Sequence, residues 1–341
     1  MMEKEINIKH IFERMLLDQR NIVDDQAYKM QVINTRDPIM FAGLDGLNNN
    51  RLLYIDLGVN VWEQSKINGL PKWKGLSLLV EYFERISVIK DRYFLIIRQE
   101  EGHSEEIFEV VLQNLIDHIL VEENRDSLFT TIYKVLDRWS HFFQKGGYRR
   151  LSDEQQRGLF GELWYIKHWM EANKEIPPLI VEQWEGPTSD RIDFKNSKCG
   201  VEIKTAVDKL TKTVKISNEK QLKLSDAVST LYLYVCFLER SKTHGMSLQE
   251  LVEDVRRQIG SQSDRLLLLF NDMLIDLGFR EEEYNENYFF VDKVELYEAN
   301  NRFPRICSEK LPKGISHVSY SIDLTHCIEF ERSIEQAYTV Y

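Results

Sequence analysis

The sequence predicts an α/β (α+β) fold in which helices flank a mixed central sheet, preceded by a separate α/β domain. Of the 341 residues, 43% are hydrophobic and 11% are aromatic, enough for two domains with sizeable cores. After residue 150 the patterns run helix, three short strands, helix, strand, an order typical of an α/β sandwich. Gly146-Gly147 interrupts a helical pattern. We therefore expect an N-terminal domain over residues 1–146 and a second domain over residues 147–341.

The N-terminal domain mixes strand and helix signals and carries nothing that resembles a catalytic motif. Runs of β-branched, aromatic and leucine residues between turn residues predict strands, at 28–33, 51–57, 76–83 and 92–98. Apolar residues then recur with helical spacing over 105–121 and 127–143. We expect this domain to contact the substrate or a partner.

The second domain begins with a well-marked helix. Ser152 and Gln155 form a capping box, and an apolar stripe follows from Leu159 to Met170. Glu162 projects along the edge of that stripe, where an unpaired carboxylate is costly to desolvate; it either reaches past the stripe to solvent or binds something. The later patterns predict strands at 179–183, 191–195, 200–206, 230–238, 288–297 and 317–322, and helices near Ser217 and over 247–259 and 264–277.

Several classes of protein are excluded by the sequence. No segment resembles a signal peptide, and no run of 18 apolar residues could span a membrane. The four cysteines are scattered and lack zinc-finger spacing, so we expect a reduced, cytoplasmic protein. There is no GxxxxGK[ST] phosphate loop, no HExxH zinc motif and no GxSxG serine-hydrolase motif.

The net charge of −11 argues against nucleic acid, but the charge is unevenly distributed. Residues 195–223 hold eight lysines and three acids, a net +5, which leaves −16 on the rest of the chain. Such a segment can form a directed phosphate-binding surface, and we expect Lys209, Lys212 and Lys215 to bind nucleic acid. The alternative is a solvated lysine-rich hairpin. Phosphate would then bind elsewhere, at Arg149, Arg150 and Arg157.

The most informative stretch is 193–204, Asp-Phe-Lys-Asn-Ser-Lys-Cys-Gly-Val-Glu-Ile-Lys. Alternate residues of a strand share a face, so Glu202 and Lys204 point the same way while the residues between them face a core. A turn at 196–200 can return the chain as an antiparallel hairpin and bring Asp193 beside Glu202. Two carboxylates at one point repel each other unless a cation neutralises them. Oxygen ligands of this kind select Mg²⁺ or Mn²⁺.

A lysine beside such a pair adds a further chemical function. A divalent ion lowers the pKa of bound water, and an adjacent ammonium stabilises the negative charge that develops on a phosphate. Asp193, the pair Glu202 and Lys204, and the helical Glu162 together match the needs of a phosphodiesterase that activates water. Acid-x-lysine alone is common on strands, mostly as solvent-facing ion pairs, so the prediction depends on the whole set.

The order of these residues resembles the PD-(D/E)xK superfamily of restriction-endonuclease-like proteins. Several segments are similar, more narrowly, to a bacterial family called PD-(D/E)xK motif proteins. These segments are GLFGEL at 158–163, WEGP at 184–187, RIDF at 191–194, VEIKT at 201–205, ISNEKQL at 216–222 and, more weakly, RFP at 302–304 and VSY at 318–320. Ile192 stands where the motif's name has proline, at a position whose side chain binds no metal.

The resemblance implies a restriction-endonuclease-like core for residues 147–341 and a role for each matching residue. Asp193 and Glu202 would bind the metal, and Glu162 would reach it directly or through water. Lys204 would assist the attacking water and the transition state. Gln221, on the helix after the third strand, would orient water or phosphate. The expected metal is Mg²⁺, for which Mn²⁺ can substitute.

The function implied by the resemblance is a magnesium-dependent endonuclease that hydrolyses phosphodiester bonds, with DNA as the expected substrate. The same resemblance implies a component of a bacterial anti-phage or restriction system, accompanied by an ATPase subunit. One alternative is a catalytically silent adaptor of the same fold that binds nucleic acid or a partner. Another is a scaffold whose N-terminal domain does the functional work.

Overall fold

The computed structural model forms two compact units, residues 1–147 and 148–341, and each is described by itself. The described residues are 6–17, 29–45, 48–60, 62–87, 89–122, 125–148, 150–186, 192–196, 198–207, 212–223, 230–242, 244–280, 283–284, 287–307 and 311–338. Four residues of the predicted motifs and surfaces lie outside them: Arg149, Pro187, Arg191 and Lys209. None of the described helices is both long and apolar enough to cross a membrane.

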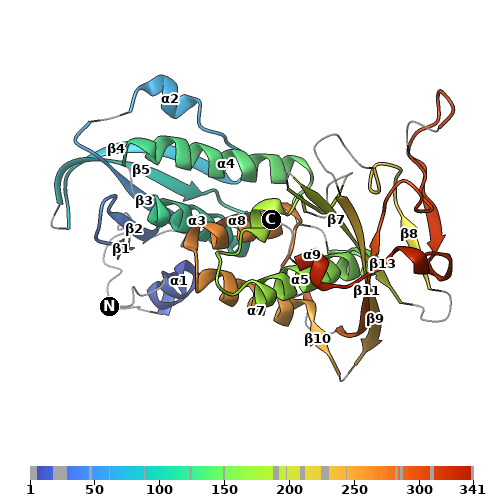
Figure 1. Ribbon diagram of the computed structural model, residues 1–341. Helices are drawn as coiled ribbons and strands as arrows, with labels where there is room; N and C mark the ends of the chain where they lie inside the picture. Colours follow the sequence, from blue (N-terminus) through green and yellow to red (C-terminus); the bar gives the residue numbers. More distant parts are fainter. Residues whose placement is uncertain are drawn as a thin grey trace. The chain divides into compact units, whose positions relative to one another are not determined.

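A five-stranded antiparallel sheet forms the centre of the first unit, in the order β1-β2-β3-β5-β4 (Figure 1). The strands β1 to β5 are Lys29–Asn34, Met40–Leu44, Arg51–Gly58, Leu76–Ile86 and Ile89–Gln99. The helices α1 to α4 are Ile8–Leu17, Gln64–Asn68, Glu105–Val121 and Leu128–Gln144. Helix α3 packs against α1, α4 and β3, and its first turn is capped by Ser104, which accepts a hydrogen bond from the backbone N–H of Ile107.

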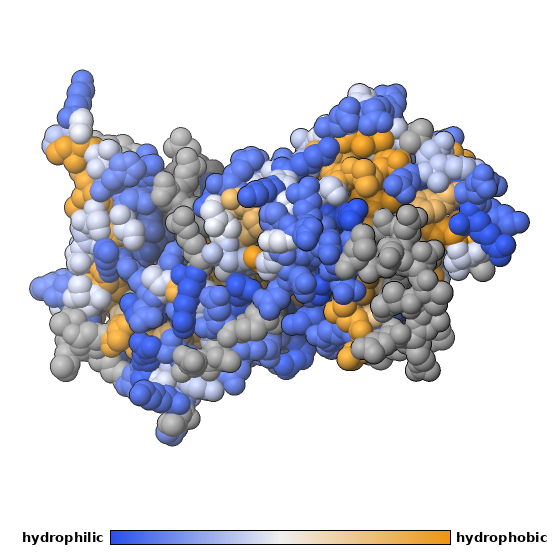
Figure 2. All heavy atoms as spheres, turned by 180° about the vertical axis from the view of Figure 1, so that it is seen from behind, coloured by the Kyte–Doolittle hydropathy of each residue, from blue (hydrophilic) through white to orange (hydrophobic). Residues whose placement is uncertain are grey.

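One face of this sheet carries a cluster of apolar side chains. Phe41, Tyr54, Phe94 and Ile96 form part of one hydrophobic cluster. Leu79 of β4 is the cross-strand partner of Ile96, so it shares that face, yet it is 43% exposed. Figure 2 shows the corresponding apolar patch over these strands. The four cluster residues are themselves buried, so of these side chains it is Leu79 that this face presents to solvent.

The second unit contains the predicted mixed sheet, in the order β10-β11-β9-β7-β6, with β13 pairing to β11. Strands β7 and β9 are parallel, whereas β6 pairs with β7, and β11 with β9, in the antiparallel sense. The strands are β6 Phe194–Lys195, β7 Cys199–Ala206, β9 Thr230–Ser241, β10 Met246–Ser247, β11 Tyr288–Glu298 and β13 Glu331–Arg332.

The two faces of this sheet are covered differently. Helix α5 packs on β7 and α7, and α7 packs on α8. The helices are α5 Asp153–Ala172, α6 Ile180–Gln183, α7 Leu248–Gly260, α8 Asp264–Asp276 and α9 Glu335–Tyr338. Two further strands, β8 Thr213–Ile216 and β12 Tyr320–Asp323, form a small antiparallel sheet, and their side chains belong to a second hydrophobic core. The predicted α/β (α+β) fold class with flanking helices is confirmed.

Some predicted elements differ from those observed. The segment 179–183, predicted as a strand, is helix α6 with Leu179 at its N-cap, because a short apolar run does not distinguish strand from helix. The helix predicted near Ser217 is absent from residues 217–223, which form bends and turns. The last predicted strand begins at Tyr320 instead of residue 317. The sequence patterns also missed α1, β2 and β8.

Candidate metal-dependent active site

The hairpin of β6 and β7 places Asp193 beside Glu202. Phe194 pairs with Val201 and Lys195 with Gly200, and the next position in this register sets Asp193 opposite Glu202. Opposing residues of an antiparallel pair share a face. The Asp193 carboxylate oxygen Oδ2 also accepts a hydrogen bond of 2.7 Å from the backbone N–H of Ile203. The predicted convergence of these two residues therefore follows from strand pairing.

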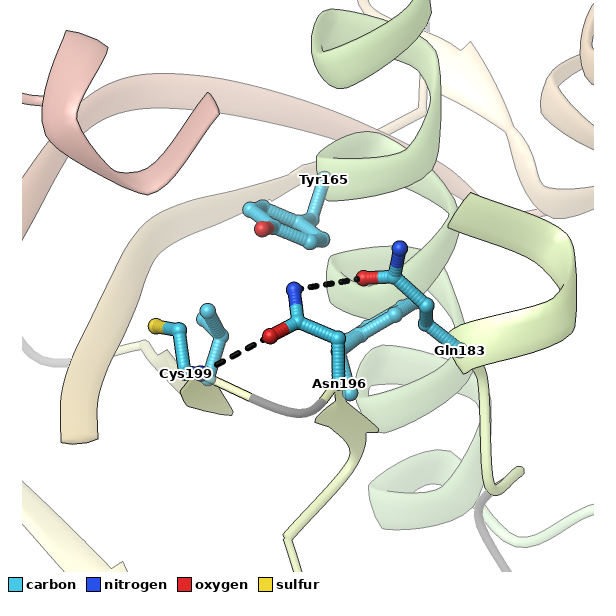
Figure 3. Close-up of a pocket in the computed structure, with 6 residues that line it drawn as sticks. Tyr165, Gln183, Asn196 and Cys199 are labelled. Atoms are coloured by element: carbon cyan, nitrogen blue, oxygen red, sulfur yellow. Dashed lines mark hydrogen bonds between the residues drawn. The ribbon is translucent and has the colours of Figure 1, made fainter. Parts of the chain in front are cut away.

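Asn196 fixes the turn that closes this hairpin (Figure 3). Its Oδ1 accepts hydrogen bonds from the backbone N–H groups of Lys198 and Cys199, both 2.8 Å long. Its Nδ2 donates to Oε1 of Gln183 on α6, at 3.2 Å. Local bonds of this kind from an asparagine side chain are typical of tight turns. The adjoining cavity, about 10 Å³ and lined in part by Tyr165, has room for about one water and not for a substrate.

Strand β7 presents Glu202 and Lys204 on one face, as its alternation predicted. Val201 and Ile203 belong to the core that contains α5. The Lys204 ammonium Nζ donates to Oε1 of Glu202 at 2.5 Å, with Glu202 fully buried and the Lys204 side chain 15% exposed. The other carboxylate oxygen of Glu202, Oε2, is buried and has no hydrogen-bond partner among the described residues. A buried carboxylate oxygen without a partner is costly.

Helix α5 supplies Glu162 to the same group. Glu162 is buried, at 5% exposure, and interacts electrostatically with Asp193, Glu202 and Lys204. The indole Nε1 of Trp184 donates a 2.6 Å hydrogen bond to Oε2 of Glu162. Gly161 permits this approach of helix to strand, because a Cβ there would lie 2.7 Å from Cγ2 of Thr205 on β7. Of the two interpretations of Glu162, the structure excludes the one in which it reaches past the stripe to solvent.

Burial raises the pKa of all three carboxyl groups. The pKa of Asp193 rises to about 6, because desolvation outweighs the opposing effects of Lys204 and of the Ile203 N–H. Desolvation, and then the charge of Asp193, raise the pKa values of Glu162 and Glu202. Desolvation lowers the pKa of Lys204, but the surrounding carboxylates outweigh it, and the net shift is upward. One ammonium therefore faces three acidic groups, and a further cation would be stabilised here.

The chemistry of these donors fits a hard divalent cation. Mg²⁺ keeps several waters and binds through one or two carboxylates. Asp193 and Glu202 supply two carboxylates, and Oε2 of Glu202 has no hydrogen-bond partner among the described residues that would compete with the ion. The part of the chain that the structure describes contains no group of three acidic, histidine or cysteine side chains arranged to hold a metal ion. One oxygen of Glu162 accepts a hydrogen bond from Trp184, and one oxygen of Glu202 accepts one from Lys204. The set of three ligands therefore stays a prediction.

Gln221 is placed differently from the expectation. It lies in a turn, where its Oε1 accepts a 2.9 Å hydrogen bond from the backbone N–H of Ser217, and not on a helix. Neighbouring Glu219 accepts a 2.9 Å bond from the N–H of Val318, which ties this turn to the strand region before β12. The structure thus gives Gln221 a role in shaping the turn, and its role toward water or phosphate stays a prediction.

The lysines predicted to bind nucleic acid have acidic neighbours from distant parts of the sequence. Lys212 Nζ lies 3.3 Å from Oε1 of Glu295 on β11. Lys215 Nζ lies 3.7 Å from Oε1 of Glu154 at the start of α5, and its side chain is 63% exposed. Lys209 lies outside the described residues. Acidic side chains from outside the segment therefore neutralise part of its net charge of +5. A nucleic-acid surface here stays a prediction.

Three supporting residues were not assigned a role from the sequence. Trp184 and Gly161 both stand in quoted motif segments, so their proximity to the motif was the available signal. Asn196 was placed only as the start of a turn. The bond from Trp184 to Glu162 spans 22 residues of sequence, and no local pattern encodes such a contact.

Comparison with known proteins agrees with the geometry. No curated protein and no solved structure matches the chain. A family model described as "Putative PD-(D/E)XK family member, (DUF4420)" matches residues 11–325. The match includes Glu162, Asp193, Glu202 and Lys204, and it also covers most of the first unit. Because it spans most of the sequence, the chain belongs to this PD-(D/E)XK family.

Proposed function

We propose that the chain is a metal-dependent nuclease that hydrolyses phosphodiester bonds, with DNA as its substrate and Mg²⁺ as its ion. The observation that carries the proposal is the buried group of Glu162, Asp193, Glu202 and Lys204, in which three carboxylates face one ammonium. Membership of a PD-(D/E)XK family supports the same chemistry. A structural ion pair would need neither the surplus of negative charge nor the unpartnered oxygen of Glu202.

Each residue of the group has a distinct task in this proposal. Asp193, oriented by the Ile203 N–H, and Glu202, oriented by Lys204, would hold the divalent ion. Such an ion would supply polarisation of the phosphate and a lowered pKa of water. The Lys204 side chain is 15% exposed and so less buried than Asp193 and Glu202. Its ammonium can donate to a phosphate oxygen and stabilise the developing charge. Glu162, held by Trp184, adds negative charge that favours the cation.

The test uses the purified chain with supercoiled plasmid, linear DNA and RNA, each with Mg²⁺, Mn²⁺ or EDTA. We expect cleavage of DNA that needs the divalent ion and is lost in Asp193→Asn, a variant of equal size that lacks the charge. Equal cleavage by wild type and variant would point to a contaminant. If the wild type cleaves none of the three substrates with either ion, the proposal is wrong.

The adaptor function is the second candidate, and one observation favours it. Lys204 already neutralises one oxygen of Glu202 at 2.5 Å, which is what a purely structural ion pair would show. An adaptor would bind nucleic acid equally well in EDTA and in Mg²⁺, and Asp193→Asn would not change that binding. A nuclease would show ion-dependent cleavage that Asp193→Asn removes.

The cellular setting is part of the proposal. The resemblance of the motifs is the basis for a role in bacterial defence beside an ATPase subunit. All four cysteines are free thiols, which supports a reducing compartment such as the cytoplasm. The apolar patch over the strands of the first unit, where Leu79 is 43% exposed, supports partner contact by that unit. Co-purification with the ATPase, lost in Leu79→Glu, would test this contact.

A further inference from the structure

A groove of about 250 Å³ lies between β12 and the segment that follows β11. Its walls include Pro304, Arg305, Ile306, Tyr320, Ile322 and Asp323. The groove is smaller than the roughly 300–1,000 Å³ of typical small-ligand pockets. It therefore accommodates a unit of about the size of one nucleotide and not the width of a duplex.

Tyr320 connects this groove to the candidate active site. Its ring lines the groove and packs against the core that contains Ile192 and Ala206. Ile192 directly precedes Asp193, and Ala206 follows Lys204 by two positions. Because Glu202, Lys204 and Ala206 alternate along β7, they share the face on which Tyr320 packs. Tyr320 therefore belongs both to the wall of the groove and to the core that lies under the residues flanking the carboxylates.

The chemistry of the walls changes along the groove. At the Tyr320 end, Arg305 is anchored by its Nη1, which donates to the backbone carbonyl of Leu222 at 2.5 Å, and by its Nη2, which donates to Asn301 at 3.1 Å. Asp323 lies three residues further along β12, about 10 Å away. Hydrogen bonds from Thr325 lower the pKa of its carboxyl group. Arg305 therefore stands at one end of the groove, and Asp323, whose Oδ2 lies 3.9 Å from Nε2 of His326, stands at the other.

Between these charges the walls are mostly apolar. Pro304, Ile306 and Ile322 line this part together with Ser321, and the phenol oxygen of Tyr320 accepts a 3.2 Å hydrogen bond from the backbone N–H of Ile306. A surface that contacted only the phosphate backbone would be polar and basic. Apolar and aromatic walls suit the faces of a nucleobase, and a base exposes its faces only when it is unpaired.

We propose that this groove binds one unpaired nucleotide of the substrate next to the scissile phosphate. The phosphate of that nucleotide lies at Arg305, its base stacks on Tyr320, and the amino edge of the base faces Asp323, as carboxylates accept hydrogen bonds from base amino groups. The inference rests on the proposed function and names its substrate class, a single strand or a nucleotide extruded from a duplex.

The test measures binding in EDTA, so that cleavage plays no part. A single-stranded oligonucleotide with 2-aminopurine at several positions, alone or annealed to its complement, is titrated into the full chain. We expect the single strand to bind more tightly than the duplex. Stacking on an aromatic ring is worth about 1–3 kcal/mol per base, so the difference should be roughly ten- to hundredfold. It should fall to about threefold or less in Arg305→Gln and in Tyr320→Leu.

Arg302→Gln is the matched control, because Arg302 lies on the same segment, is 78% exposed and pairs with Glu329 outside the groove. This variant should retain the preference for the single strand. Equal binding of single strand and duplex by the wild type, or an unchanged preference in both groove variants, would overturn the inference. Arg305→Gln replaces a half-buried side chain, so it provides a result even if Tyr320→Leu fails to fold.

A separate cleavage assay distinguishes the inference from the proposed function. If the wild type prefers single strands through Arg305 but cleaves nothing in Mg²⁺ or Mn²⁺, the groove is correct and the nuclease function is wrong. If the wild type cleaves DNA while the groove variants bind and cleave as it does, the nuclease function stands and the groove inference is wrong.

Discussion

Two strands of the same sheet each carry a glutamate and a lysine two positions apart, and the surroundings of the two pairs differ. On β7, Lys204 donates to Glu202 at 2.5 Å. On β11, Lys293 donates to Glu295 at 2.7 Å. Glu295 also accepts a 2.6 Å bond from the hydroxyl of Tyr297 and lies 3.3 Å from Lys212. Where Glu295 has Lys212 and the Tyr297 hydroxyl, Glu202 has two acidic neighbours, Asp193 and Glu162.

The pKa shifts of the two glutamates have opposite directions. Desolvation raises the pKa of Glu295, but bonds from Lys293 and Tyr297 outweigh it, and the net shift is downward. The pKa of Glu202 is raised by desolvation and by Asp193, and Lys204 does not compensate. An acid and a lysine at this spacing therefore indicate no function by themselves. A deficit of positive charge around the buried pair on β7 is what indicates a cation site.

The largest effect should come from removing one lysine of each pair. Lys204→Ala should reduce cleavage by about 10²–10³-fold, because it removes a group that stabilises charge in the transition state, and should change DNA affinity little. Lys293→Ala, the matched control on β11, should leave cleavage within about twofold. Single-turnover rates and binding titrations of both variants measure these effects. Similar losses in the two variants would show that the pair on β7 has no special role in cleavage.

The sequence could predict the β7 pair because its signals are local. The alternation of Val201, Glu202, Ile203 and Lys204 places the charges on one face, and the structure confirms it through the core packing of Val201 and Ile203. The capping box of α5 is likewise encoded within four residues, and both of its hydrogen bonds are present. By contrast, no local pattern could show that Glu295 accepts a hydrogen bond from Lys212, 83 residues away in the sequence.

The second effect concerns pH and metal. The pKa of Asp193 is about 6 in the folded chain against a usual 3.8, so between these values the folded state binds more protons than the unfolded one. Stability therefore falls as pH rises through this window, and the ionised group costs about 3 kcal/mol at pH 7. The advantage of Asp193→Asn over wild type in free energy of unfolding should grow from pH 4 to pH 7. Denaturant titrations without metal measure it.

A divalent ion should reverse this cost in the wild type alone. At pH 7, Mn²⁺ or Mg²⁺ should raise the thermal midpoint of the wild type by several degrees. The gain should shrink at pH 5, where protons compete for the carboxylates, and should be absent in Asp193→Asn. The Glu295 site, already neutralised, offers no comparable gain, so Glu295→Gln should keep the full response. Coinciding melts with and without the ion would contradict the metal site.

The third effect separates two glycines of α5. Gly161→Ala places a Cβ 2.7 Å from Cγ2 of Thr205, a stiff β-branched side chain, and should destabilise the chain by about 1–3 kcal/mol while displacing the adjacent Glu162. At Gly158 a Cβ meets nothing within 4 Å, so Gly158→Ala should stabilise the helix by about 0.5–1 kcal/mol. Thermal melts and cleavage rates test both variants. A destabilising Gly158→Ala, or a harmless Gly161→Ala, would refute the close packing of α5 on β7.

The smallest effect tests whether neutralised lysines contribute to nucleic-acid binding. Glu295 lies beside both Lys293 and Lys212, so Lys212→Ala should barely change the dependence of DNA affinity on salt. Lys215 is more exposed and its contact with Glu154 is longer, 3.7 Å; Lys215→Ala should reduce the salt slope by up to about one unit. Glu154→Gln should act in the opposite direction, because it frees Lys215 to meet phosphate. Binding titrations between low and moderate salt measure all three slopes. Equal slopes for the two lysine variants would show that the ion pairs do not determine which lysine contacts phosphate. Unchanged slopes in all three variants would place the phosphate contacts on other residues, Arg150 and Arg157 among them.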